Sequence, residues 1–176
     1  MERKDISYWR WLFRGTPRAG CKRLVNWWLP GHVVIGVALA AGVLSDIAAS
    51  ANTVLLPLVG ILIGLTFAWA GNAQALLQSE EMQRLSDNRE GGYREYVFAY
   101  QTAILVILIT LVLWAIAGLR LFDTSWPTRH RAPEYFAVKS LLFTLSSLTL
   151  RECWQTVMGA QWMLLAQKTI RDIDRR

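Results

Sequence analysis

The sequence predicts an all-α integral membrane protein, in which four transmembrane helices form a bundle behind an amphipathic interfacial N-terminal segment. Three observations lead to this class. First, 53% of the 176 residues are hydrophobic and the mean hydropathy is +0.26, which is high for a soluble domain. Second, the apolar residues collect into runs long enough to cross a bilayer. Third, the charged residues, 18% of the chain, collect between these runs.

Residues 1–30 form the predicted interfacial segment. They are rich in basic and aromatic residues, and glycine and proline interrupt them at 15–17 and end them at 30–31. One or two short helices are expected here, with arginines toward lipid phosphates and rings toward the acyl boundary. The rings expected at the interface belong to Trp9, Trp11, Phe13, Trp27 and Trp28.

Residues 31–176 form the predicted four-span domain, with helical extensions in the cytoplasm. The first two spans cover about 32–50 and 54–77. Both carry small residues four positions apart, and such spacing lets a second helix approach closely. A tight hairpin of these two spans is therefore expected. The small residues assigned to helix packing are Gly36, Ala40, Gly42, Gly60 and Gly64.

The other two spans cover about 97–119 and 135–157. The third is the most hydrophobic, and the fourth is expected to continue as one helix through Lys168. The fourth span carries Arg151 and Glu152 side by side within an apolar run. A charge at membrane depth is expensive, so these side chains should face protein or water and not lipid.

Basic residues predict the orientation of the bundle. Fourteen of the nineteen Lys/Arg lie in the N-terminal segment, the loop between spans two and three, and the C-terminal tail, while the loop between spans one and two has none. The positive-inside rule then places both termini of this multi-pass chain in the cytoplasm, in a cell membrane of the bacterial inner-membrane type. The net charge of +6 is expected to meet anionic lipid headgroups, and no nucleic acid partner is expected.

The polar residues of three spans are expected to form one layer in the cytoplasmic third of the bundle. On span four, steps of three and four residues place a polar stripe on a single helix face. Spans two and three contribute polar residues near their cytoplasmic ends, and all should bond to one another or to water. The residues assigned to a pore lining or polar layer are Ser140, Thr144, Ser147, Arg151, Glu152, Gln155, Asn72, Gln74, Gln101 and Thr102.

The leading functional prediction is an oligomeric ion channel or membrane-permeabilising effector in which span four lines the path. Small hydroxyl groups can line such a path, and a ring of arginines favours anions. The alternative is a non-catalytic membrane subunit or accessory factor that docks or regulates a partner membrane protein. A third interpretation keeps the polar layer purely structural, locking the helices together.

Enzymatic activity is not expected. Arg151 and Glu152 are adjacent, so they point about 100° apart on a helix. No catalytic motif such as HExxH or GxSxG accompanies them. Neither Cys21 nor Cys153 belongs to a ligand cluster, and the two histidines are expected on opposite sides of the membrane. No cofactor and no metal are therefore predicted.

Overall fold

The computed structural model describes residues 8–14, 27–79, 92–120 and 133–174. Within these ranges the ordered elements are all helical and no strand occurs, which confirms the predicted all-α class. The helices are α1 (Tyr8–Arg14), α3 (Leu29–Gly42), α4 (Ile47–Ser50), the π-helical turn η1 (Ala51–Leu55), α5 (Leu56–Leu77), α7 (Gly92–Gly118) and α8 (Pro133–Asp174).

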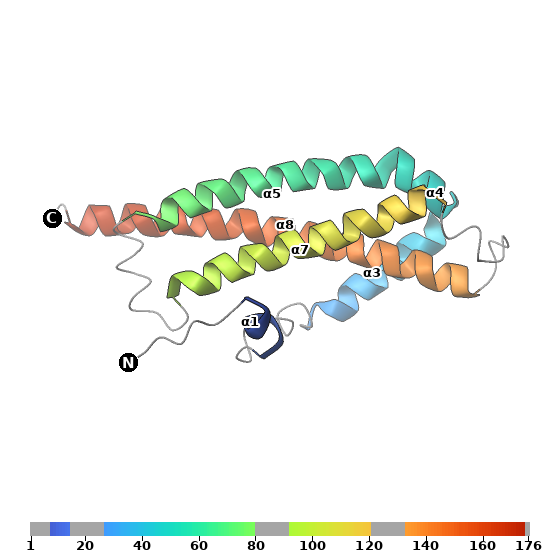
Figure 1. The fold of residues 1–176 in the computed structure, drawn as a ribbon, viewed down its shortest axis with the longest axis horizontal. Coiled ribbons are helices and arrows are strands. Elements are labelled where there is room, and N and C mark those ends of the chain that lie inside the picture. Colours follow the sequence, from blue (N-terminus) through green and yellow to red (C-terminus); the bar gives the residue numbers. More distant parts are fainter. Residues whose placement is uncertain (1–7, 15–26, 80–91, 121–132, 175–176) are drawn as a thin grey trace.

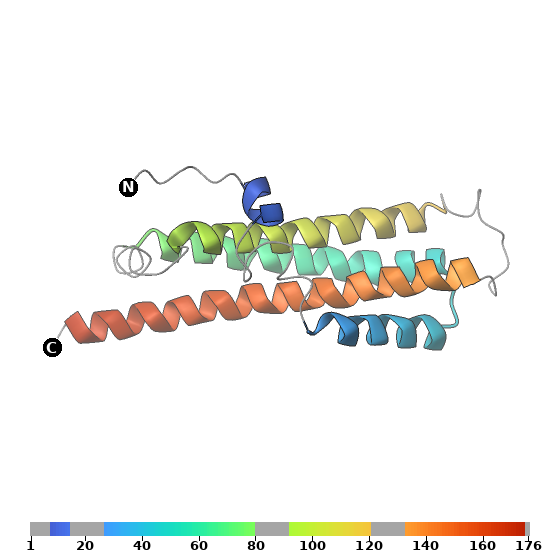
Figure 2. The same cartoon turned by 90° about the horizontal axis from the view of Figure 1, so that it is seen from below.

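Helices α3, α5 and α7 each pack on α8 (Figures 1 and 2). Helix α8 has 42 residues and runs without a break, so the predicted single long helix is confirmed. Its first half lies against α3, while α5 and α7 pack along it on another side. Neighbouring helices alternate in direction, except that α5 and α8 run the same way. A helix of this length spans about 63 Å, roughly twice the apolar core of a bilayer.

Two helical stretches in the described chain are long and apolar enough to cross a membrane. They are Ile47–Ala75, which joins α4, η1 and α5, and Val97–Gly118 in α7. Only 22% and 33% of these apolar stretches are buried. A core helix of a soluble protein would be mostly buried, so the exposed apolar faces suit contact with lipid. Helix α3 is also apolar but has only 14 residues, about 21 Å of helix.

The first predicted span, 32–50, is wrong at its C-terminal boundary. Helix α3 ends at Gly42, and a new helix starts after Asp46. The carboxylate of Asp46 accepts a hydrogen bond from the backbone N–H of Ala49 at 2.6 Å, as an N-cap does. The second apolar stretch therefore begins seven residues earlier than the predicted Val54, at Ile47. An aspartate directly before an apolar run was the available signal.

Pro57 lies inside this second apolar stretch, as the second residue of α5. A proline in a helix removes one backbone donor and crowds the preceding turn. The π-helical turn just before it widens the helix at that point, and the N–H of Leu56 bonds to the carbonyl of Ala51. The wide turn therefore accommodates Pro57 without ending the helix.

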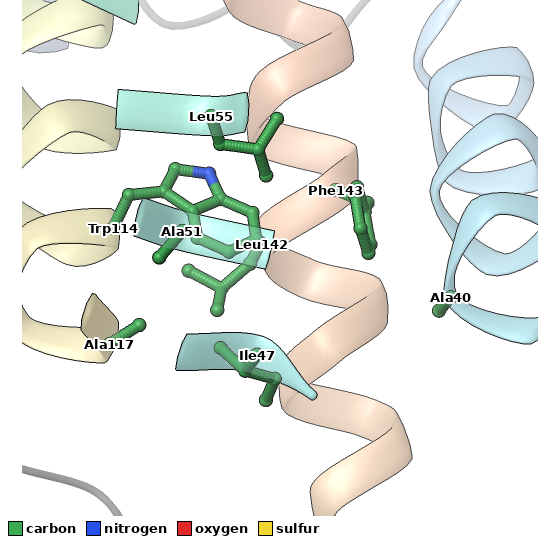
Figure 3. Packing of buried hydrophobic residues seen from close by; sticks show 8 residues of the cluster. All are labelled: Ala40, Ile47, Ala51, Leu55, Trp114, Ala117, Leu142 and Phe143. Carbon is green, nitrogen blue, oxygen red and sulfur yellow. The ribbon is translucent and has the colours of Figure 1, made fainter. Parts of the chain in front are cut away.

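The largest buried cluster holds the helices together at the end where α8 begins (Figure 3). The Trp114 ring has no exposed surface and meets Phe143 edge to face, with ring centroids 5.6 Å apart. Its indole N–H also donates to the hydroxyl of Ser146 at 2.9 Å. Apolar residues of α3, α4, η1, α7 and α8 meet here: Ala40, Ile47, Ala51, Leu55, Trp114, Ala117, Leu142 and Phe143.

Candidate functional site

The polar stripe of α8 lies against α3. The side chains of Ser140 and Thr144 are buried, and that of Ser147 is half-buried. The Thr144 hydroxyl donates to the Ser140 carbonyl at 2.7 Å, so this hydroxyl is bonded within its own helix. The part of the stripe that the sequence assigns to a pore lining is thus covered by another helix of the same chain.

Gly36 makes the close approach of α3 and α8 possible. A Cβ added at Gly36 would lie 2.1 Å from the Thr144 hydroxyl and 2.7 Å from the Thr144 backbone nitrogen. No other side chain fits in that space, and Ala40, one turn further along, is also buried. The small residues of α3 therefore pack on α8.

The expected tight hairpin of the first two spans is not the arrangement found, because α3 packs along α8 and not along α5. Gly60 and Gly64 are exposed on α5, and a Cβ added at either would meet nothing within 4 Å. Gly42 of α3 is equally open. The four-residue spacing of small residues is the same in Gly36/Ala40 and in Gly60/Gly64. The two pairs differ in that a second helix covers only the first of them.

His32 joins the first turn of α3 to the middle of α8. Its Nδ1 lies 2.8 Å from the Ser147 hydroxyl oxygen, within hydrogen-bond distance. The Arg151 guanidinium, one turn further along α8, lies close enough to act on His32 electrostatically. Nη1 of Arg151 is buried and has no hydrogen-bond partner among the described residues. A half-buried cation thus lies near an imidazole where α3 begins.

Contacts between α7 and α8 fix the level of Arg151 along the bundle. The hydroxyls of Thr110 and Thr149 are 2.9 Å apart, and Tyr100 lies beside Gly159. In this antiparallel pair, the apolar stretch of α7 is therefore level with about residues 141–162 of α8. Arg151 stands near the middle of that length, about 15 Å from either end.

Along α8, this position lies nearer the middle of the apolar surroundings than the sequence predicts. The expectation took span four to end near residue 157, whereas the neighbours of α8 extend its apolar surroundings to about residue 162. The parallel contact with α5 agrees, since Thr66 donates to Cys153 at 3.2 Å and Ala73 packs beside Ala160. The register between neighbouring helices decides how far along the bundle Arg151 lies. The sequence of a single segment does not encode that register.

The expected polar layer is not brought together as one layer. Asn72, Gln74 and Gln101 are exposed. Thr102 is buried, but its hydroxyl donates to the Phe98 carbonyl at 2.8 Å and also lies 3.3 Å from the Tyr8 hydroxyl. These residues share an end of the bundle, yet their helices turn them to different faces.

Glu152 and Gln155 lie on α8 close to Arg151. Glu152 is 1% exposed and Gln155 is half-buried. Because Glu152 follows Arg151 directly, its side chain leaves α8 about 100° away from the face that meets α3. The adjacent opposite charges therefore belong to different surroundings, and Glu152 extends the buried polar positions to another side of α8.

Cross-helix bonds along α8 are the polar feature that the sequence interpretation missed. Thr110 and Thr149, both fully buried, bond to each other, and Thr66 bonds to Cys153. Single threonines in apolar helices are common, so their sequence carried no pairing signal. Such bonds join α7 and α5 to α8 without a charged group.

Lys139 is a second cation that the sequence interpretation did not single out. It is 6% exposed, and its Nζ donates to the carbonyls of Val43 at 2.5 Å and Ser45 at 3.0 Å. Tyr135 supports the same turn, because its hydroxyl accepts from the N–H of Ile47 at 2.8 Å. A lysine one turn after the start of a long apolar run was the available signal.

The N-terminal helix α1 packs on α7. Tyr8 and Trp11 contact the Phe98 ring, and Leu12 is buried. The other face of α1 is open, with Trp9 and Phe13 exposed and stacked on each other. Trp27 and Trp28 are also exposed, before α3. Four of the five rings assigned to the interface therefore lie on the surface, and Trp11 is half-buried.

No family model, no curated protein and no solved structure matches the chain.

Proposed function

We propose that the chain is a multi-pass membrane protein that assembles into a small anion-permeable channel. The observation that carries the proposal is the position of Arg151, a half-buried cation level with the middle of an apolar stretch of 22 residues. An ionisable group at such depth is costly and generally marks a path or a binding site. The proposal involves no catalytic step.

Four helical segments would cross or enter the membrane in this proposal. Ile47–Ala75 and α7 are apolar enough to do so, and α8 lies between them and α3. The alternating directions of α3, α5 and α7 suit a bundle with both termini on one side. The distribution of Lys/Arg favours the cytoplasm for that side, in a bacterial inner membrane.

Helix α8 would line the path, and α3 would close it. Beyond Arg151 the same face of α8 continues without α3, through half-buried Gln155. Trp154 and Trp162, on this half of α8, are 65% and 67% exposed. A second copy placed over this open half would enclose a polar path up to Arg151. Its continuation along Ser147 would open when α3 moves.

Ion flux through liposomes tests the channel directly. Purified protein should release trapped chloride faster than trapped sodium, and Arg151→Leu should remove that preference. Lys168→Leu is the matched control, because Lys168 is an exposed cation on α8 outside the proposed path. A wild type without leak, or an Arg151→Leu variant with unchanged selectivity, would contradict the proposal.

A second candidate function is a non-catalytic subunit that docks a partner membrane protein. It is favoured by the exposed face of α5, where small residues recur at Gly60, Gly64, Ala68, Gly71 and Ala75. No neighbour lies within 4 Å of a Cβ added at any of the three glycines. Small residues on a membrane helix let another helix approach closely.

Crosslinking in native membranes separates the two candidates. A photo-reactive residue at Ala68 should capture a different membrane protein if docking is the function, whereas a residue at Trp162 should capture a second copy in the channel. Only self-adducts from both positions would exclude the docking subunit. A chain that stays monomeric in nanodiscs would exclude the shared path.

A further inference from the structure

The two ends of α3 are attached to α8 in different ways (Figure 2). At the C-terminal end, the Lys139 ammonium group donates to the two backbone carbonyls of Val43 and Ser45. The buried residues of α3, Gly36 and Ala40, lie in its middle and toward the same end. Residues 33–35, in the first two turns, are exposed. The start of α3 therefore packs on α8 less closely than the rest of the helix.

A side-chain hydrogen bond attaches this start to α8. His32 lies in the first turn of α3 and is half-buried, and its Nδ1 is 2.8 Å from the Ser147 hydroxyl oxygen. A neutral imidazole can make this bond in either tautomer, because a hydroxyl group both donates and accepts. Histidine ordinarily changes charge between about pH 5 and pH 8. The attachment of α3 thus involves a group whose charge can change near neutral pH.

A positive charge on His32 would face other positive groups. Arg151 lies one turn beyond the partner of His32 on the same face of α8 and acts on the imidazole electrostatically. The first turn of α3 has no side-chain cap and is the positive end of the helix dipole. Among the described acidic residues, Glu152 leaves α8 about 100° from this face, and Asp46 lies beyond the opposite end of α3, near Lys139.

We propose that α3 is a pH-sensitive cover of the polar stripe on α8, in which neutral His32 holds the start of α3 at Ser147 and protonated His32 is repelled by Arg151. In the covered arrangement α3 lies over Ser140 and Thr144, as in this structure. In the displaced arrangement the start of α3 moves away from Arg151, and the end held by Lys139 stays attached.

The direction of the pH response follows from the charges. A proton on His32 is opposed by Arg151 in the covered arrangement and is less opposed once the start of α3 has moved away. The displaced arrangement therefore binds more protons, and its population rises as the pH falls. The cover rests on the proposed function in one respect, since displacement of α3 would open the continuation of the anion path along Ser147.

The test measures the position of α3 and does not require conduction. Double electron–electron resonance gives the distance between spin labels at Val34 of α3 and Ile61 of α5, which are both exposed. The full chain is used in nanodiscs after Cys21 and Cys153 are replaced. Lowering the pH from about 7.5 to about 5.5 should increase the displaced population at least about threefold. A second pair, Leu39 and Ile61, reports the end near Lys139 and should change little.

Three variants identify the titrating group. His32→Gln still offers a hydrogen bond to the Ser147 hydroxyl but does not titrate, so its distances should be equal at both pH values. His130→Gln is the matched control, because it removes the other histidine of the chain and should respond as the wild type does. Arg151→Gln covers the case in which His32→Gln does not fold, and it should reduce the pH response.

Two results would overturn the cover. One is a wild type whose distances do not change with pH. The other is an equal pH response of the wild type and His32→Gln, because a different group would then be titrating. The channel can fail separately. Displacement at low pH without chloride flux in liposomes would leave the cover and remove the channel, and chloride-selective flux with α3 fixed at both pH values would do the reverse.

Discussion

Two cations on one helix have opposite surroundings. Lys139 is buried among backbone carbonyls at the end of α3, and Arg151 stands beside the uncapped start of α3. Both lie in the stretch of α8 that the sequence predicts as the fourth span. The sequence shows two charges in an apolar run, but the antiparallel pairing of α3 and α8 decides which of them has partners.

Replacing Lys139 by Met should destabilise the turn between α3 and α4. The carbonyls of Val43 and Ser45 would lose a charged donor, at a cost of about 2 kcal/mol. The measurement is the thermal midpoint of unfolding in detergent, compared with Lys168→Met, which changes an exposed lysine of the same helix. Equal midpoints for the two variants would show that the Lys139 bonds contribute nothing.

Replacing Gly36 by Ala should destabilise the contact between α3 and α8 by about 1–3 kcal/mol, because the added methyl overlaps Thr144. Gly42→Ala is the matched control, since a Cβ there meets nothing within 4 Å and alanine favours a helix. The same unfolding assay should show a lower midpoint for the first variant alone. A stabilised Gly36→Ala variant would mean that α3 does not pack this closely.

Helix boundaries show which part of the fold the sequence predicts. The apolar runs place α7 and the first half of α8 where they are expected, and α8 continues through a polar tail to Asp174. The end of α3 and the start of α4 were not found, because the intervening residues are short and mostly apolar. Asp46 and Lys139, which define that break, act through a local cap and a contact that is distant in sequence.

The candidate site was predicted only in part, because some of its features are local patterns and others depend on contacts between helices. The polar stripe of α8 is a local pattern, and the periodicity identifies it. Its covering by α3 depends on Gly36, whose spacing resembles that of the exposed Gly60. His32 lay outside the predicted layer, because nothing in its own segment ties it to Ser147. Pairing of helices, and not the properties of single segments, supplies that information.

Replacing Asp46 by Ala should weaken the start of α4 by about 1 kcal/mol through loss of the N-cap bond to Ala49. The loss should appear as faster hydrogen exchange over Ile47–Ser50. Asp172→Ala, at an exposed position in the last turn of α8, should leave exchange in this region unchanged. Unchanged exchange in both variants would argue that the Asp46 cap contributes nothing to this turn.

At the scale of the whole molecule, the proposed orientation puts the α3–α4 turn and the C-terminus on opposite sides of the membrane. A reporter that is active only in the periplasm should be silent when fused after Arg176 and active when inserted after Leu44, which is almost fully exposed. Activity at Arg176 would reverse the orientation. Activity at both positions would mean that the chain does not cross the membrane as proposed.

The level of Arg151 in the bilayer is the claim on which the proposed channel depends. Spin labels at Leu44, Leu108 and Ile173, one at each end and one level with Arg151, sample exposed positions along the bundle. Native cysteines are replaced first, and collision rates with oxygen and with a water-soluble nickel complex are measured in nanodiscs. We expect the ratio of oxygen to nickel collisions to be highest at Leu108 and low at Leu44 and Ile173. Nickel access at Leu108 equal to that at Ile173 would place this level in water and contradict the account.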